Sequence, residues 1–505
     1  TQSGGSATDV TNNGGTVNID AGTAASLTNG AGAGTSNVTD GQVTGTTTIG
    51  GGAVVVDQTT DDADLELVGT TTVNDGTLTV TDGEVGAVIN QGTSGGATEV
   101  TLTDGDIASL TNTSGDAALN GGTVTGATTV ADGTVTNAGA AITTAATSGT
   151  GIYTQSGGSA TDVTNNGGTV NVAGGTANSV TNGVGATTTN ISGGTVANDV
   201  TVGGGVANLT TDADVDGGLV VNAGTANVSD NTDVAGTTTV ATGATLSVTG
   251  GTLAEVENNG STNVTISGGT VANVDHNSGT TDLTGGSVTG ATDVADGTVS
   301  NSGATITTAT TSSTGTYTQT GGTSTDVANN GGTVNLDGGT TATLTNGAGA
   351  GTSTVTDGQV TGTTTINGSA VGVDQATDDA DLELVGTTTV NDGTLTVTDG
   401  EVGTVINQGT SGGATEVTLT DGDIASLTNT SGDAALNGGT VTGATTVADG
   451  TVTNAGAAIT TAAASGTGTY TQSGGSSTDV TNDGATVNIA GGTIGSLDNT
   501  ASAHT

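Results

Sequence analysis

Short apolar residues return at nearly constant intervals along the chain, inside phrases such as GGTVTGATTVADGTVTN at 121–137. Equivalent positions lie 19 residues apart between Ile19 and Val38, and 17 apart between Ile107 and Val124. Within each phrase apolar and polar residues alternate, which is the period of a β-strand. A repeat of this length predicts one coil of a parallel β-solenoid, in which each coil buries its inward side chains against its neighbours.

The composition limits how wide the core can be. The chain has 94 Gly and 31% apolar residues, and its only aromatic residues are three Tyr. Without large side chains a thick globular core cannot be filled, but Val, Ile, Leu, Ala and Thr can fill a narrow one. Disorder is the alternative that the glycine content and charge favour, whereas the regular β-branched spacing and the absence of Pro favour order. We therefore expect an all-β, elongated parallel β-solenoid with coils of about 17–19 residues, and no helices.

The charge is one-sided, because the chain carries 48 acidic residues and no Lys or Arg. Phosphate recognition needs cations, so nucleic acid is excluded as a partner. The lack of an 18-residue apolar run predicts no membrane insertion. Self-repulsion is relieved by cations, which suggests a salty or calcium-containing medium. There is no Cys, and the chain starts at Thr1 without a signal peptide, so we expect a segment of a longer secreted protein.

A second, longer repeat divides the sequence. The phrase TQSGG or TQTGG begins at residues 1, 154, 318 and 471. Unit A′ nearly copies unit A, whereas units A and B keep the apolar rhythm but exchange Asp-Gly for Gly-Gly, as a turn with positive φ allows. We predict these repeat units: 1–153 (A), 154–317 (B), 318–470 (A′) and 471–505 (truncated B′).

The best candidate metal ligands are Asp212, Asp214 and Asp216 in the sequence DADVDGG. They have the one-three-five spacing of a calcium loop, followed by Gly217. The acid usual at position twelve is missing, because Ala223 stands there. The alternative is a strand or loop with outward-facing acids.

A second calcium candidate is the sequence DDADLE, which occurs twice. Its carboxylates are Asp61, Asp62, Asp64 and Glu66, and in the copy Asp378, Asp379 and Asp381. The surrounding segment 56–69 breaks the apolar rhythm, as does 208–221, so both are expected to be loops or irregular coils. Surface acids in a loop are again the alternative.

Other chemistry has weaker support. Paired carboxylates can hydrolyse glycosides, but no aromatic or basic residue accompanies these acids to hold a sugar, so we expect no enzyme. His276 aligns with Asn112 of the sister unit and is expected to be a turn substitution. Asp275 beside it would point to the opposite face of a strand. Each complete unit ends in a tyrosine, expected to pack in a wider coil or else to anchor a partner: Tyr153, Tyr317 and Tyr470.

The phrases at 121–137 and 167–182 resemble the repeats of AIDA-type autotransporter adhesin passengers. They are also similar to the repeat regions of giant bacterial surface adhesins and of fibrous surface-layer proteins. This resemblance implies a secreted right-handed β-helix that serves at the bacterial cell surface as a stalk, adhesin or matrix fibre. The segment 4–9, GGSATD, lacks the third Gly of the calcium nonapeptide of RTX repeats, so that ion site is not carried over.

These observations predict a non-enzymatic extracellular structural or adhesive protein. Its expected partners are other copies of itself, in filaments or sheets, or cell-surface glycans, with Ca²⁺ bridging acidic faces. One alternative is an ice- or glycan-binding module that uses threonine runs such as 46–48 and 70–72. That module needs Thr at one place in successive coils, and the varying coil length argues against it. A polysaccharide-active β-helix enzyme is the other alternative.

Overall fold

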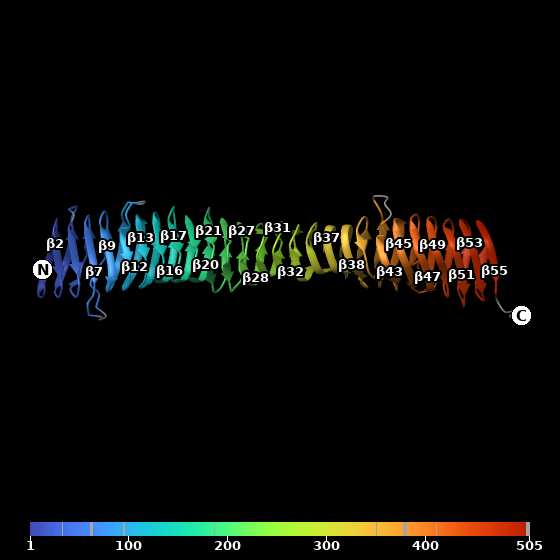
Figure 1. The fold of residues 1–505 in the computed structure, drawn as a ribbon, viewed down its shortest axis with the longest axis horizontal. Coiled ribbons are helices and arrows are strands. Elements are labelled where there is room, and N and C mark those ends of the chain that lie inside the picture. Colours follow the sequence, from blue (N-terminus) through green and yellow to red (C-terminus); the bar gives the residue numbers. More distant parts are fainter. Residues whose placement is uncertain are drawn as a thin grey trace. The chain divides into compact units, whose positions relative to one another are not determined.

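The computed structural model describes residues 1–32, 34–60, 64–93, 96–185, 187–349, 351–376, 381–410 and 412–500. The chain divides into two compact units, Thr1–Ala254 and Glu255–Thr505. Across the described residues the regular structure is strand, without helix. The strands of each unit stack side by side (Figure 1), and the predicted all-β parallel solenoid is confirmed, with about 27 coils.

The first unit contains the strands β1 (Ser6–Asn12), β2 (Thr16–Ile19), β3 (Thr23–Asn29), β4 (Thr35–Val38), β5 (Gln42–Val43), β6 (Thr47–Ile49), β7 (Ala53–Asp57), β8 (Thr71–Val73), β9 (Thr77–Asp82), β10 (Glu84–Gln91), β11 (Val100–Leu102), β12 (Asp106–Ser114), β13 (Asp116–Leu119), β14 (Thr123–Val130), β15 (Thr134–Asn137), β16 (Ala141–Thr147), β17 (Ile152–Gln155), β18 (Ser159–Asn165), β19 (Thr169–Val172), β20 (Thr176–Asn182), β21 (Thr188–Ile191), β22 (Gly194–Val196), β23 (Val200–Val202), β24 (Val206–Leu209), β25 (Ala213–Val215), β26 (Leu219–Val221), β27 (Thr225–Val228), β28 (Asp233–Ala241) and β29 (Thr245–Val248). The division between the units falls within β30 (Thr252–Asn259).

The second unit contains the strands β31 (Asn263–Ile266), β32 (Thr270–Ser278), β33 (Thr280–Leu283), β34 (Ser287–Val294), β35 (Thr298–Asn301), β36 (Thr305–Thr311), β37 (Thr316–Asn329), β38 (Thr333–Asn346), β39 (Thr352–Val355), β40 (Gln359–Val360), β41 (Thr364–Ile366), β42 (Ala370–Asp374), β43 (Leu384–Val390), β44 (Thr394–Asp399), β45 (Glu401–Gln408), β46 (Val417–Leu419), β47 (Asp423–Ser431), β48 (Asp433–Leu436), β49 (Thr440–Val447), β50 (Thr451–Asn454), β51 (Ala458–Ser465), β52 (Thr469–Gln472), β53 (Ser476–Asp483), β54 (Thr486–Ile489) and β55 (Thr493–Asn499).

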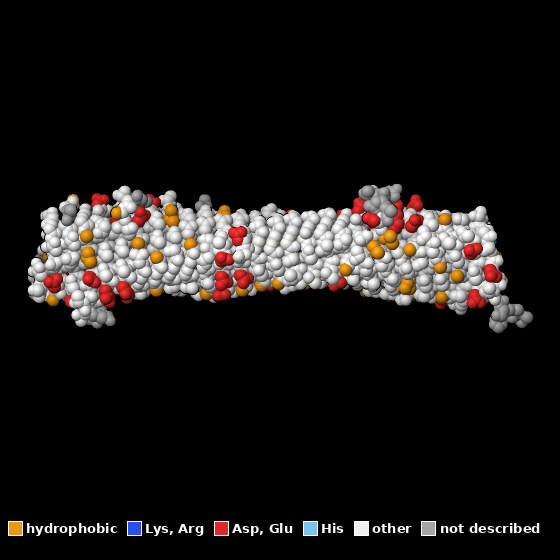
Figure 2. Space-filling model, in the orientation of Figure 1, with side chains coloured by type: hydrophobic (Ala, Val, Ile, Leu, Met, Phe, Trp, Pro, Cys, Tyr) orange, Lys and Arg blue, Asp and Glu red, His pale blue; other side chains and the backbone are white. Residues whose placement is uncertain are grey.

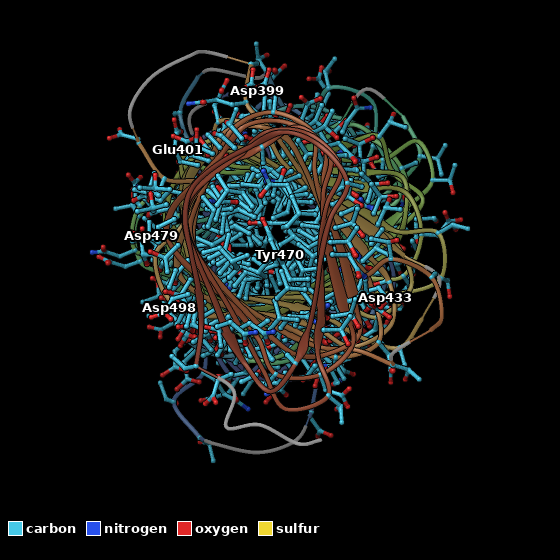
Figure 3. All side chains as sticks on the ribbon, turned by 90° about the vertical axis from the view of Figure 1, so that its right-hand side faces the viewer. Asp399, Glu401, Asp433, Tyr470, Asp479 and Asp498 are labelled. Atoms are coloured by element: carbon cyan, nitrogen blue, oxygen red, sulfur yellow. The ribbon has the colours of Figure 1, made fainter. Side chains whose placement is uncertain are left out.

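A typical coil consists of one long bent strand and one short strand. In β18 the alternation of inward and outward residues is interrupted by two successive outward residues, Thr161 and Asp162, which mark the bend. The long strand β18 pairs in parallel with β20, and the short strand β19 pairs with β21. The bent strand therefore supplies two sides of the coil and the short strand supplies the third. The side chains of the second unit fill the inside of its coils, with Tyr470 at the centre (Figure 3).

The core is one or two side chains across, as predicted. Inward positions of successive coils hold stacked Val, Ile, Leu and Ala, such as Leu78, Val100 and Ala117. One inward column, at the end of the bent strand, is called the polar column because Asn and Thr occupy many of its positions, with Val or Ile at others. There Asn165 is fully buried and its amide donates to the carbonyl of Thr188 at 2.8 Å. Side-chain amides can satisfy the turn's backbone groups, so this polar column is compatible with a dry core.

Glycine is required at the turns because coils stack closely there. Gly122 has φ of +70°, and a Cβ on it would lie 2.1 Å from the carbonyl oxygen of Gly105. Gly105 itself has φ of +80°. Both the left-handed backbone and the close approach exclude a side chain. This explains why Gly-Gly and Asp-Gly exchange in the sequence while the second glycine stays.

The two segments that break the sequence rhythm have different structures. Segment 208–221 is not a loop, because it contains the end of β24 and all of β25 and β26, which pair in parallel with neighbouring strands. Its irregularity is confined to Thr211 and Asp212, which have φ of 45° and 60°. Segment 56–69 does leave the coil after β7 and returns at the buried Leu67. Such insertions lengthen individual coils, so that outward side chains stacked on neighbouring coils are separated by 17 to 24 residues in the sequence.

Candidate functional site

A polar cavity of about 230 Å³ lies where segment 56–69 rejoins the first unit. Beside Thr23 and Leu65, its lining side chains are two carboxamides and three carboxylates: Gln42, Gln58, Asp40, Asp64 and Glu66. The second unit contains an equivalent cavity of about 300 Å³, lined by Asp357, Gln359, Gln375, Asp381 and Glu383. Two predicted ligands, Asp64 and Asp381, therefore border cavities, whereas Asp61, Asp62, Asp378 and Asp379 lie outside the described residues.

Asp40 holds the start of this segment. One of its carboxylate oxygens accepts hydrogen bonds from the backbone N–H groups of Thr59 at 2.9 Å and Thr60 at 3.2 Å. The Thr59 hydroxyl donates to the other oxygen. All three hydrogen bonds lower the pKa of Asp40, and the bond from the Thr59 hydroxyl has the largest effect. In the second unit Asp357 accepts the N–H of Ala376 at 3.1 Å.

Glu66 and Gln42 hold the end of the segment. The Glu66 side chain is 4% exposed and accepts the N–H of Glu84 at 2.7 Å. The Gln42 amide donates to the carbonyl of Leu65 at 3.1 Å. Sequence reasoning missed Asp40 and Gln42 because they belong to the preceding coil.

The acids Asp212, Asp214 and Asp216 lie along one outward side of β25 and its flanks, while Ala213 and Val215 point inward. Only Asp214 lies within the strand, since Asp212 precedes it with φ of 60° and Asp216 follows it, and among the described residues the three carboxylates are not gathered into one calcium loop. Asp214 pairs in register with Asp233 of the next coil. The exposed acids of this part of the first unit are Asp199, Asp212, Asp216, Asp230 and Asp233, and a group of acids is visible near β28 (Figure 2).

The candidate cation sites differ from a compact metal centre. Within the described ranges no three acidic or histidine side chains are grouped closely enough to hold an ion. Outward residues two apart on a strand are separated by about 6.6 Å, so they present carboxylates in a row. Such a row suits loosely held cations better than one fully coordinated ion. Specific calcium binding by Asp212, Asp214 and Asp216 stays a prediction.

The second unit carries a row of carboxylates on the outer surface of β32 and its neighbours. Asp275 pairs in register with Asp293. Partial burial, and then repulsion by Glu257, Asp293 and Glu255, raise the pKa of Asp275. Like charges stacked in this way oppose folding at neutral pH.

The prediction that His276 substitutes at a turn is wrong. His276 lies within β32, is fully buried, and points into the core as Asn112 does in the first unit. Its Nδ1 lies 3.0 Å from the Thr281 hydroxyl. Burial lowers the pKa of His276. The hydrogen bond with the Gly279 backbone and the charge of Asp296 raise this pKa by smaller amounts. Asp275 points outward, which confirms that the two residues do not form a dyad.

The three tyrosines are core residues, as one of the two alternatives predicted. Tyr153, Tyr317 and Tyr470 are fully buried. The Tyr153 hydroxyl donates to Gln155 Oε1 at 3.1 Å. Burial raises the pKa of Tyr153 to about 12 and also raises the pKa of Tyr317 and Tyr470. With no exposed ring surface, these side chains are not anchors for a partner.

An outward column of threonines follows the second half of the bent strands in the first unit. Thr48 pairs in register with Thr72, although the coil between them carries the 56–69 insertion. The objection that varying coil length would disrupt such a column is therefore wrong, because the register of Thr48 with Thr72 is kept across the 56–69 insertion. Threonine fills ten of these thirteen paired positions: Thr11, Thr28, Thr48, Thr72, Ile89, Thr111, Thr129, Ala146, Thr164, Thr181, Thr201, Val220 and Thr239.

The short strands carry a second outward column. In the first unit Asn171, Asn190, Asn208 and Asn227 occupy it in four successive coils. Each amide donates to the Oδ1 of the preceding asparagine at 2.8 to 2.9 Å. Asn171 in turn donates to the Thr154 hydroxyl at 3.3 Å. The result is a continuous hydrogen-bonded ladder over five coils.

Comparison with known proteins finds no matching family model, no matching curated protein and no matching solved structure. Over the described residues, no helix is long and apolar enough to cross a membrane. The site geometry therefore has to be interpreted from its own chemistry.

Proposed function

We propose that this chain is a non-enzymatic structural segment of an extracellular or cell-surface fibre or stalk. The observation that carries the proposal is the register of the coils, which persists across the inserted segments. Thr48 still pairs with Thr72, and Val55 still pairs with Thr79, across the 56–69 insertion. A solenoid that keeps its register transmits load from coil to coil through every strand pair.

The contacts between coils suit a load-bearing role. Backbone hydrogen bonds join successive coils at short distances, such as 2.7 Å between the N–H of Gly183 and the carbonyl of Asn165. The asparagine ladder adds side-chain bonds in the same direction. Each neutral hydrogen bond contributes about 1 kcal/mol net, and repetition multiplies this contribution along a unit.

An extracellular setting is supported by composition. The chain has no Lys or Arg, so proteases that cleave after basic residues have no site, and it contains no Cys or Met to oxidise. The resemblance to bacterial adhesin and surface-layer repeats points in the same direction. Multivalent weak contacts by outward Thr, Asn and Asp would supply an adhesive function along the same surface.

Single-molecule pulling of the full chain tests the structural proposal. Coils should be released one after another, each adding roughly 60 Å of contour length for about 18 residues. Stepwise extensions of this size at reproducible force would support a load-bearing solenoid. Smooth entropic stretching without steps would contradict it.

A second candidate function, binding of ice or of a flat crystalline glycan, is favoured by the threonine column on the bent strands. Thr164, Thr181 and Thr201 present hydroxyls at the same place in successive coils. We expect Thr181→Tyr to abolish binding on this surface because the ring would project above the column. Retention on growing ice or on crystalline polysaccharide, measured with the Ile152→Tyr variant as a control on another side of the coil, checks this. Equal retention of both variants would reject the threonine column as the binding surface.

A further inference from the structure

Two outward columns of the short strands in the first unit carry few charges over thirteen coils, and together they form one face. We call it the short-strand face. One of its two columns has no acidic residue: Asn18, Asn37, Val55, Thr79, Thr101, Ala118, Thr136, Thr154, Asn171, Asn190, Asn208, Asn227 and Ser247. The other column has two acids: Thr16, Thr35, Ala53, Thr77, Glu99, Asp116, Thr134, Ile152, Thr169, Thr188, Val206, Thr225 and Thr245.

The two acids within these columns accept hydrogen bonds from the chain's own backbone, whereas Asp57 and Asp82, at the ends of β7 and β9, are exposed beside the columns. The Asp116 carboxylate accepts the N–H of Thr134 at 3.1 Å. Glu99 is 7% exposed and accepts the N–H of Asp116 at 2.6 Å. By contrast, the second half of the bent strands exposes Asp9, Asp162 and Asp199.

We propose that the short-strand face binds the same face of a second copy of this chain. This inference rests on the proposed structural role and specifies how such segments assemble. Charge selects the partner: each chain has a formal charge of −48, so copies repel one another wherever acids face each other. The two columns of the short-strand face let copies approach with only Asp116 and the largely buried Glu99 as acids between them, and burial of a carboxylate without a partner is costly.

The shape and size of the face also fit a second copy. Its columns repeat once per coil, so a two-fold axis that lies in the interface plane places the columns of one copy against those of the other. Ile152 is 38% exposed at its middle and supplies an apolar contact. Thirteen strands at about 4.8 Å spacing and about 13 Å width give roughly 800 Å² per copy, the size of a standard stable interface.

Sedimentation equilibrium of the full chain tests the proposal at physiological salt. The face variant combines Thr154→Asp with Asn208→Asp, which adds two charges to the short-strand face. The matched control combines Thr164→Asp with Thr201→Asp, which adds the same charge to the threonine column of neighbouring coils. Circular dichroism verifies that both variants keep the β-structure of the unmodified chain.

We expect a reversible dimer for the unmodified chain and the control, and at least about tenfold weaker dimerisation for the face variant. A chain that stays monomeric, or equal weakening by both double variants, would overturn the inference. A monomer that is retained on a polysaccharide matrix through this face would assign the face to a glycan instead. Monomers that still show stepwise release under force would reject the pairing but keep the structural role.

Discussion

The side-chain amide of Asn208 donates a 2.9 Å hydrogen bond to Oδ1 of Asn190, in the preceding coil. Asn190 makes the same bond to Asn171. Because each amide both donates and accepts, removing one member leaves two neighbours with an altered partner.

We predict that Asn190→Ala lowers the stability of the first unit by about 1–2 kcal/mol, since two ladder bonds are lost at a partly exposed site. Thr188→Ala, an outward substitution in the same strand, is the control and should cost less than about 0.5 kcal/mol. Denaturant midpoints and local hydrogen exchange in β19 to β24 measure the difference. Equal effects of both substitutions would show that the ladder does not contribute.

The buried tyrosines predict alkaline instability. The pKa of Tyr153 is raised to about 12 in the folded chain, above about 10 for an unfolded tyrosine. Because the pKa is higher in the folded chain, the neutral tyrosine contributes its full stability below the pKa of the unfolded chain. This contribution is lost as the pH rises toward the pKa of the folded chain. Phenolate absorbance should therefore stay absent up to about pH 10 and appear together with unfolding. Ionisation near pH 10 without unfolding would contradict the burial of these rings.

The carboxylate row beside His276 predicts a stabilising substitution. The pKa of Asp275 is raised in the folded chain, so its ionisation disfavours folding, and stability is lost as pH rises through that pKa. Asp275→Asn should raise the melting temperature at neutral pH, and the increase should be smaller in acid or in high salt. Asp296 is the opposite case, because the Thr314 hydroxyl and the Gly297 N–H lower its pKa, and Asp296→Asn should destabilise the chain. Identical responses of the two variants would contradict this assignment.

The extended arrangement of Asp214, Asp216 and Asp233 predicts loose cation binding. Millimolar calcium should raise the melting temperature of the chain, and magnesium should act similarly, because a row of carboxylates lacks a cage that selects by size. The double variant Asp214→Asn with Asp233→Asn should reduce the response. Calorimetry that detects one tight, calcium-selective site lost in this variant would instead establish a specific site.

The fold was predictable because period-two alternation and a repeat near 18 residues permit few structures for a chain without large side chains. Details that depend on matching one coil with the next were not predictable. His276 occupies an inward polar column, which sequence reasoning interpreted as a turn because asparagine is common in both. The cavity that combines Asp40 with Asp64 and Glu66 joins residues from different coils across an insertion, where coil spacing no longer gives the partner.

The register of successive coils can be tested directly with cysteine pairs, because the chain has no native Cys. Thr181 pairs with Thr201 across residues 183–187, so Thr181→Cys with Thr201→Cys should form an intramolecular disulfide rapidly on mild oxidation. Asp199 lies two residues before Thr201, so its Cα is about 8 Å from that of Thr181. This distance is beyond the span of a disulfide. Rapid bridging of the first pair and not of Thr181→Cys with Asp199→Cys would support the stacked register. Equal bridging of both pairs, or bridging of the second alone, would contradict it.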